Sequence, residues 1–123
     1  MIDWTFPTRA EVLANKLDPD NIEGNIATGR VRDLVIAVHD HEDDPDFKDE
    51  YYVFFHTNKW TWDCYEELLG VDVVRPENFQ ELCESLVNTL IDKIGPDESL
   101  AEALDKECAP YAGDPLRWSH LRW

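Results

Sequence analysis

Two short apolar runs in the first half of the chain predict β-strands. Residues 34–38 and 51–55 are rich in β-branched or aromatic side chains, and both runs are too short to be typical helices. Neither run alternates apolar with polar positions, so we expect both faces of each strand to be covered, as at the centre of a sheet. The segment that joins them is shorter than the dozen or more residues of a parallel crossover, so the strands should pair antiparallel.

The second half of the chain has the apolar spacing of helices. Residues 79–94 repeat apolar positions at the helical period and stop at a Gly-Pro break. Asp97 can cap a further helix, and a shorter helix is expected between a cap at Asp63 and a stop at Gly70. The positions expected to face the core on the two longer helices are Phe79, Leu82, Cys83, Leu86, Val87, Leu90, Ile91, Ile94, Leu100, Ala103, Leu104 and Cys108.

The N-terminal segment predicts one further helix. Thr8 and Glu11 form a capping box at its start. Trp4 and Phe6, in the lead-in before this helix, are expected to anchor onto the core. Residues 18–30 are rich in Asp, Asn and Gly, which is typical of a loop.

Two weaker patterns could add strands to the sheet, namely residues 22–28 as an edge strand and residues 71–74 as a third strand. A helix, then two or three strands, then more helices is an order typical of an α+β domain. We therefore expect residues 1–123 to form a single domain, in which a small antiparallel sheet is packed by an N-terminal helix and C-terminal helices.

The acidic balance of the chain is its strongest compositional signal. Twenty-seven acids against eleven Lys and Arg give a net charge of −16, while 43% hydrophobic residues argue for a folded core. This charge disfavours direct binding to nucleic acid or to an anionic membrane, and it attracts a basic partner instead. Adaptation to high salt or simple solubility is the alternative, and it predicts acids spread evenly over the surface.

Cysteine usage and the absence of leader and catalytic motifs favour a cytoplasmic protein that is not an enzyme. No basic segment followed by an apolar one stands near Met1, and no apolar run approaches bilayer length. Cys64, Cys83 and Cys108 are odd in number and contain no Cys-x-x-Cys pair, which is typical of reduced thiols. Acids beside Cys64 disfavour a thiolate there, and Cys83 lies on the apolar helix face. Signatures such as Gly-x-Ser-x-Gly and His-Glu-x-x-His are absent, so we expect no catalytic residues and no cofactor.

The segment between the two predicted strands gathers acids. Residues 40–50 carry seven acids against one lysine, and because like charges repel, folding gains nothing from crowding them. Two tryptophans follow the second strand at i and i+2, so their rings face one side if the segment stays extended. Packing of at least one ring in the core is the alternative. The candidate partner-binding residues are Asp40, Glu42, Asp43, Asp44, Asp46, Asp49, Glu50, Trp60 and Trp62.

A metal site is another use of the same segment. His39, His41 and the loop carboxylates are of the types that bind zinc or a hard cation, and His56 could complete a set. In an antiparallel pair, His39 and His56 would stand roughly 17 Å apart along the strands, too far for a shared ion. The segment also lacks the glycine and the ligand spacing of an EF-hand. We therefore assign no metal and rank a small metal-dependent enzyme below a binding protein.

In size, acidity, cysteine usage and lack of catalytic motifs, the whole chain resembles bacterial immunity proteins that protect cells from their own nuclease toxins. Those of contact-dependent growth inhibition and other polymorphic toxin systems are the most similar kind. The resemblance implies a cognate toxin encoded alongside, whose basic active-site or nucleic-acid-binding surface the chain would occlude. A DNA mimic that inhibits a host DNA-binding protein is the second hypothesis, and acids at regular, phosphate-like intervals would favour it.

Overall fold

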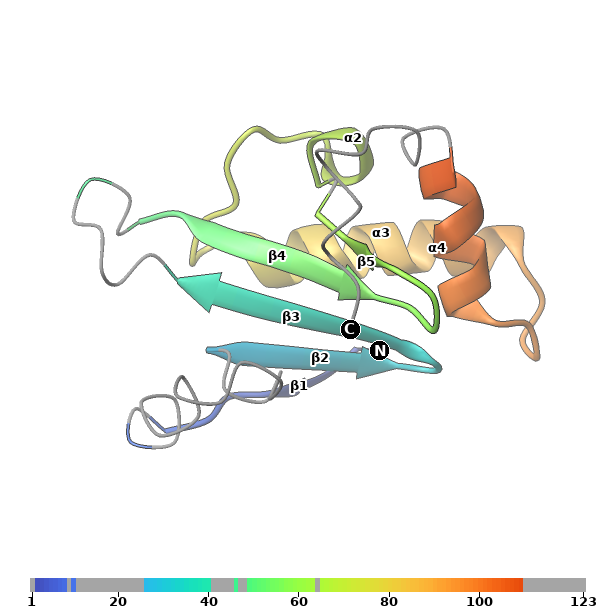
Figure 1. The fold of residues 1–123 in the computed structure, drawn as a ribbon, viewed down its shortest axis with the longest axis horizontal. Coiled ribbons are helices and arrows are strands. Elements are labelled where there is room, and N and C mark those ends of the chain that lie inside the picture. The colour runs from blue at the N-terminus through green and yellow to red at the C-terminus, as the bar shows by residue number, and fades with distance from the viewer. Residues whose placement is uncertain are drawn as a thin grey trace.

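The computed structural model describes residues 2–8, 10, 26–40, 46, 49–63 and 65–109. Its five strands form one antiparallel sheet in chain order, and α3 lies across one face of that sheet (Figure 1). The elements are β1 (Asp3–Thr5), β2 (Ala27–Val31), β3 (Leu34–Asp40), β4 (Tyr51–His56), β5 (Thr61–Trp62), α2 (Tyr65–Leu69), α3 (Phe79–Lys93) and α4 (Leu100–Cys108).

The predicted α+β architecture is confirmed, but the sheet has five strands rather than two or three. β3 and β4 are the two predicted strands and pair antiparallel, with Val38 opposite Val53. Of the strand predicted at residues 22–28, Ala27 and Thr28 belong to β2, while residues 22–25 lie outside the described ranges. Its predicted position at the edge of the sheet is wrong, because β1 pairs with the outer side of β2. The predicted third strand is also wrong, since residues 71–74 contribute a single bridge, from Val74 to Tyr51.

Gly29 explains why the sequence does not predict the whole of β2 as a strand. Glycine is disfavoured in strands and is one of the residues that make residues 18–30 typical of a loop. In the structure Gly29 lies opposite Trp4, and a Cβ atom on it would come within 2.8 Å of Ile2 and 3.0 Å of the Trp4 ring. The missing side chain therefore leaves the space into which Trp4 packs, and β1 completes the sheet.

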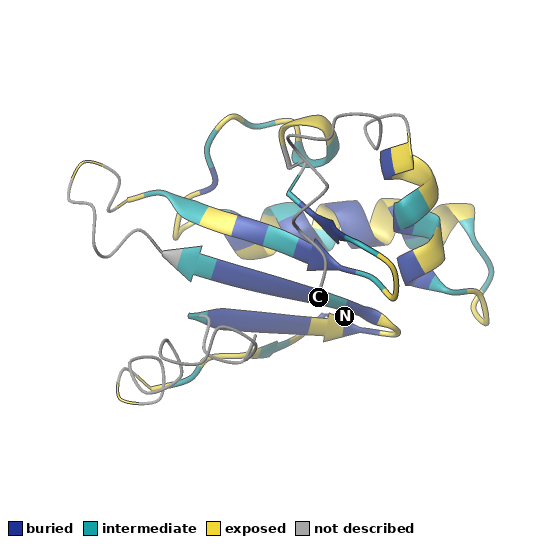
Figure 2. Ribbon diagram, viewed as in Figure 1, coloured by how far each residue is buried: buried dark blue, intermediate teal, exposed yellow. Residues whose placement is uncertain are grey.

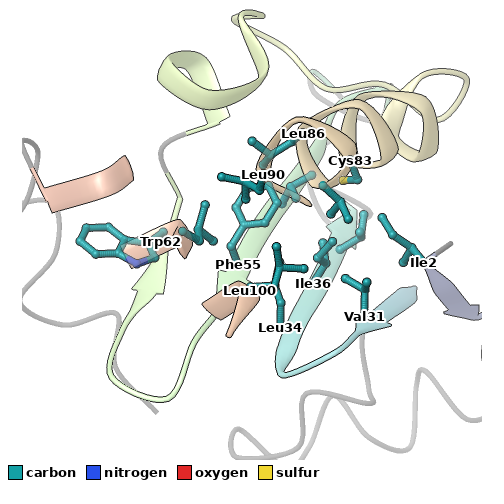
Figure 3. Close-up of a cluster of buried hydrophobic side chains, with 14 of the residues drawn as sticks. Ile2, Val31, Leu34, Ile36, Phe55, Trp62, Cys83, Leu86, Leu90 and Leu100 are labelled. Carbon is teal, nitrogen blue, oxygen red and sulfur yellow. The ribbon is translucent and has the colours of Figure 1, made fainter. Parts of the chain in front are cut away.

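The core lies between the sheet and the two longer helices. Alternate residues of β3, namely Leu34, Ile36 and Val38, are fully buried against α3. On α3 the predicted apolar stripe is confirmed: Figure 3 shows Cys83, Leu86 and Leu90 among the strand side chains, and Leu82 and Ile91 pack around them, partly buried. Burying each large apolar side chain contributes about 1.5–3 kcal/mol. The other members of the core are Ile2, Ala27, Val31, Val53, Phe55, Trp62, Val74, Phe79, Val87, Leu100, Leu104 and Cys108.

The N-terminal aromatic residues do not both anchor the lead-in. Trp4 packs against the core, with its ring 5.3 Å from that of Phe79 in an edge-on contact. Phe6 stacks on Trp4 but remains 55% exposed, so its expected role as an anchor is wrong. The capping box at Thr8 and Glu11 and the helix that it predicts fall mainly on residues outside the described ranges.

The short helix α2 ends at Gly70 as the sequence predicts, but α4 is capped differently from the prediction. Gly70 has φ of 73° and donates its N–H to the Glu66 carbonyl, which ends α2 in the left-handed conformation that glycine adopts freely. The N-cap of α4 is Ser99, not Asp97, and its side chain accepts a hydrogen bond from the Glu102 N–H. Within the described ranges, no helix is both long enough and apolar enough to cross a bilayer.

Candidate functional site

The acidic segment, residues 40–50, ends directly before the first residue of β4. The Tyr51 N–H donates to the Val74 carbonyl at 2.7 Å, and this contact brings the segment before α3 alongside the start of β4. The start of β4, the segment before α3 and the first turn of α3 therefore lie at the same end of the sheet, and each carries acidic residues (Figure 1). We call this group of six the acidic end: Asp46, Asp49, Glu50, Asp72, Glu77 and Glu81.

Most carboxylates of the acidic end have no structural contacts. In the described part of the chain, no hydrogen bond or ion pair engages the side chains of Asp49, Glu50, Asp72, Glu77 and Glu81. All of them are exposed except Glu50, which is half-buried. Arg75, which is also exposed, lies between Asp72 and Glu77 in the sequence. Asp46 takes part in an interaction, but the other five carboxylates make no hydrogen bond or ion pair in the described part of the chain.

The opposite end of the sheet engages its charged residues in structural contacts. There the β2–β3 turn places Arg32 in the left-handed region, with φ of 53°. Its guanidinium Nη1 donates to the carbonyls of Gly95 and Glu98, both at 3.1 Å. The turn therefore holds the α3–α4 connection against the sheet.

Asp33, the next residue of the turn, acts as an additional cap for α4. Its carboxylate accepts hydrogen bonds from the Ser99 hydroxyl and, at 2.9 Å, from the Ala101 N–H. Burial raises the pKa of Asp33, but these hydrogen bonds outweigh that effect and hold the pKa below its ordinary value of 3.8. A carboxylate at a helix N-terminus also interacts favourably with the helix dipole. We call the contacts of Arg32 and Asp33 the helix junction.

The β4–β5 turn lies at the same end as the helix junction. Trp62 is 1% exposed, and its indole N–H donates to Asp105 of α4 at 2.8 Å. The same carboxylate oxygen accepts from the Thr57 hydroxyl at 2.9 Å, so one acid ties the turn to the helix. Trp60 is half-buried, with its ring 5.6 Å from that of Trp62. Trp62 is therefore a core residue rather than a surface contact.

The structure does not bring the predicted partner-binding residues together. Asp46 and Asp49 are exposed and Glu50 is half-buried, all just before β4, whereas Trp60 and Trp62 follow its far end. The length of β4 separates the two groups. The side chain of Asp40 and the residues Glu42, Asp43 and Asp44 lie outside the described part of the chain.

The histidines stand apart on one face of the sheet. His39 lies opposite Tyr52 and His56 opposite Val35, a separation of about 13 Å along the strands at 3.3 Å per residue. Burial, and then the charge of His39, lower the pKa of His56 to about 4, and its Nδ1 lies 3.0 Å from the Thr61 hydroxyl. Where the structure describes the chain, no three His, Cys, Asp or Glu residues are grouped to hold a metal. His41 lies outside the described residues.

Tyr52 is a surface residue that the sequence analysis did not single out. Both faces of β4 were expected to be covered, yet Tyr52 is 45% exposed, and Figure 2 shows exposed, half-buried and buried positions along β4. Tyr52 and Phe54 occupy alternate positions of β4 and therefore share one face, opposite the buried Val53, and Glu50 lies directly before the strand. The residues of β4, Tyr-Tyr-Val-Phe-Phe-His, do not alternate apolar with polar side chains, so no local pattern in the sequence marks Tyr52 as exposed.

The described cysteines are buried and are not candidates for a reactive thiolate. Cys83 and Cys108 are fully buried, and burial, followed by the nearby charge of Glu84, raises the pKa of the Cys83 thiol to about 12. A thiol in that state is protonated at neutral pH and is a poor nucleophile. Cys64 lies outside the described residues.

A hollow of about 590 Å³ lies between α3 and α4. Its apolar side chains are Leu90, Ile94 and Ala103, and the Lys93–Glu107 ion pair, at 2.9 Å, also lines it. Because both signs of charge line this hollow, it has no clear preference for a charged ligand. The acidic end, where one sign dominates, is the stronger candidate for binding.

Comparison of the chain with protein-family models, with curated proteins and with solved structures finds no match.

Proposed function

We propose that this chain is a non-enzymatic binding protein that neutralises a basic protein partner through the acidic end. One observation supports this above the others: four carboxylates at that end are exposed and make no hydrogen bond or ion pair within the described residues, namely Asp49, Asp72, Glu77 and Glu81. Charge that contributes nothing to folding, and repels itself, is expected where it meets an opposite charge on a partner.

A nuclease toxin is the partner that best fits this chemistry. The cleft of a nuclease must be positive in order to hold phosphates, so a surface of carboxylates can occupy it in place of the substrate. Such charge complementarity speeds association and disfavours partners of the wrong sign. The function we propose is therefore that of an immunity protein of a contact-dependent inhibition or polymorphic toxin system, acting in the cytoplasm.

The direct test is capture of the partner from the native host at low salt, followed by a nuclease assay of the captured protein. We expect a basic protein whose nuclease activity is lost when one equivalent of this chain is added. Capture of a host DNA-binding protein without nuclease activity would favour the DNA-mimic hypothesis. Recovery of no basic protein would overturn the proposal.

A pair of matched variants then locates the contact. Changing Asp46 and Asp49 to Asn should slow association roughly three- to tenfold at low salt and weaken its salt dependence, because steering depends on local charge. The control changes Asp97→Asn and Glu98→Gln, which are exposed acids beside the helix junction. The control removes the same amount of charge and should slow association less. Equal effects would mean that net charge, rather than the acidic end, steers the partner.

A further inference from the structure

An exposed aromatic ring stands directly beside the acidic end. Tyr52 is 45% exposed and is, with Phe6, one of two large apolar side chains exposed in the described part of the chain. Glu50 lies directly before β4 and precedes Tyr52 by two residues, and Phe54 follows Tyr52 by two on the same face of the strand. A carboxylate and an aromatic ring are therefore close neighbours in the chain at the start of β4.

The ring of Tyr52 lies beside other rings on the same face of the sheet. Its centroid lies 6.1 Å from that of Phe54, and the planes are tilted by 37°. The Phe54 ring in turn meets the His39 ring edge-on, with centroids 5.4 Å apart. Phe54 and His39 are both half-buried, so Tyr52 is the most exposed of these three rings.

The spacing of Glu50 and Tyr52 suits a planar cation. Residues two apart in a chain have Cα atoms at most about 7 Å apart, and a cation within about 6 Å of a ring centroid is attracted by its face. A guanidinium stacked on Tyr52 can therefore pair with the Glu50 carboxylate at the same time. Arginine suits this arrangement better than lysine, because its planar group stacks on rings and binds carboxylates through two donors.

We infer that Glu50, Tyr52 and Phe54 form a recognition row that receives an arginine side chain of the basic partner. The inference rests on the proposed function and specifies it: the carboxylates of the acidic end attract the partner, and the row distinguishes arginine from lysine.

Two peptides of equal charge, nona-arginine and nona-lysine, test this by isothermal titration at low salt. The unmodified chain should bind nona-arginine more tightly than nona-lysine. Tyr52→Leu should reduce that preference about fivefold, through loss of the cation–π contact, while affinity for nona-lysine stays nearly unchanged. Tyr52→Phe keeps the ring and should keep the preference.

Phe6→Leu is the matched control, because it removes the other large exposed ring of the described residues, which follows β1 and is separated from β4 by β2 and β3. It should leave both affinities unchanged. An unaltered arginine preference in Tyr52→Leu, or an equal loss in Phe6→Leu, would overturn the inference. The proposed function would survive that result if Asp46→Asn with Asp49→Asn still weakened binding of both peptides. Binding of neither peptide would count against the proposed function as well.

Discussion

Both ends of the sheet carry acidic residues, but these residues differ in their hydrogen bonds. At the helix junction, Asp33 caps α4, and nearby Asp105 holds the indole of Trp62. At the acidic end, Asp49 and Asp72 are exposed and make no such contact within the described residues. Figure 1 shows that the length of β3 and β4 separates these ends. An acidic composition alone therefore does not identify a functional surface.

This difference gives a criterion for deciding which carboxylates of an acidic protein stabilise its fold and which are available for binding. A carboxylate that accepts hydrogen bonds from backbone N–H groups or buried side chains contributes to folding, and its removal leaves donors unpaired. A carboxylate that is crowded among like charges without such contacts contributes little to folding or opposes it. We expect the first kind to affect stability when it is changed and the second kind to affect binding.

The largest expected effect contrasts an aromatic residue from each end. Trp62→Ala should lower the free energy of unfolding by about 3–5 kcal/mol, since it removes a large buried ring and leaves Asp105 without one of its donors. Tyr52→Ala, at the exposed end, should cost much less. Urea denaturation followed by far-UV circular dichroism measures both. A Tyr52 variant as unstable as the Trp62 variant would contradict the assignment of Tyr52 to a binding surface.

The second effect is a dependence of stability on pH from the buried histidine. The folded-state pKa of His56 is about 4, below the ordinary value of 6.5, so folding favours the neutral ring. This contribution is fully present above pH 6.5 and is lost as the pH falls through 4, and it amounts to about 3 kcal/mol at most. Denaturation curves between pH 7 and 4 should show the loss. His56→Gln should remove most of it.

His39→Gln is the control for this pH effect. Burial lowers the pKa of His56 more than the charge of His39 does. His39→Gln should therefore retain the larger part of the pH dependence. Equal flattening in both variants would mean that the charge of His39, and not burial, dominates.

The smallest effect compares two carboxylates directly. Asp33→Ala should destabilise the fold by about 1–2 kcal/mol, because it removes an acceptor at the N-terminus of α4. Asp49→Asn should leave the unfolding midpoint unchanged, since its carboxylate has no partner in the described residues. Parallel thermal melts at neutral pH measure both. If Asp49→Asn destabilised the fold as much as Asp33→Ala, the distinction between the two ends would be wrong.

Local periodicity accounts for the elements that the sequence predicted well. The stripe from Phe79 to Leu90 repeats at the helical period, and the apolar runs of β3 and β4 leave little choice of structure. Neighbouring residues carry this information. Trp62 shows the limit of such reasoning, because nothing near it in the sequence reveals that Asp105, 43 positions away, accepts its N–H.

The sequence by itself determined the α+β class, the antiparallel pairing of the two central strands and the charge that favours a basic partner. Tertiary structure alone decided that Gly29 makes room for Trp4, that Asp33 caps a helix 66 residues away from it at Ser99, and that Tyr52 is exposed beside Glu50. The physical reason is that periodicity and charge are properties of neighbouring residues. Space, unpaired donors and exposure depend on which distant segments meet.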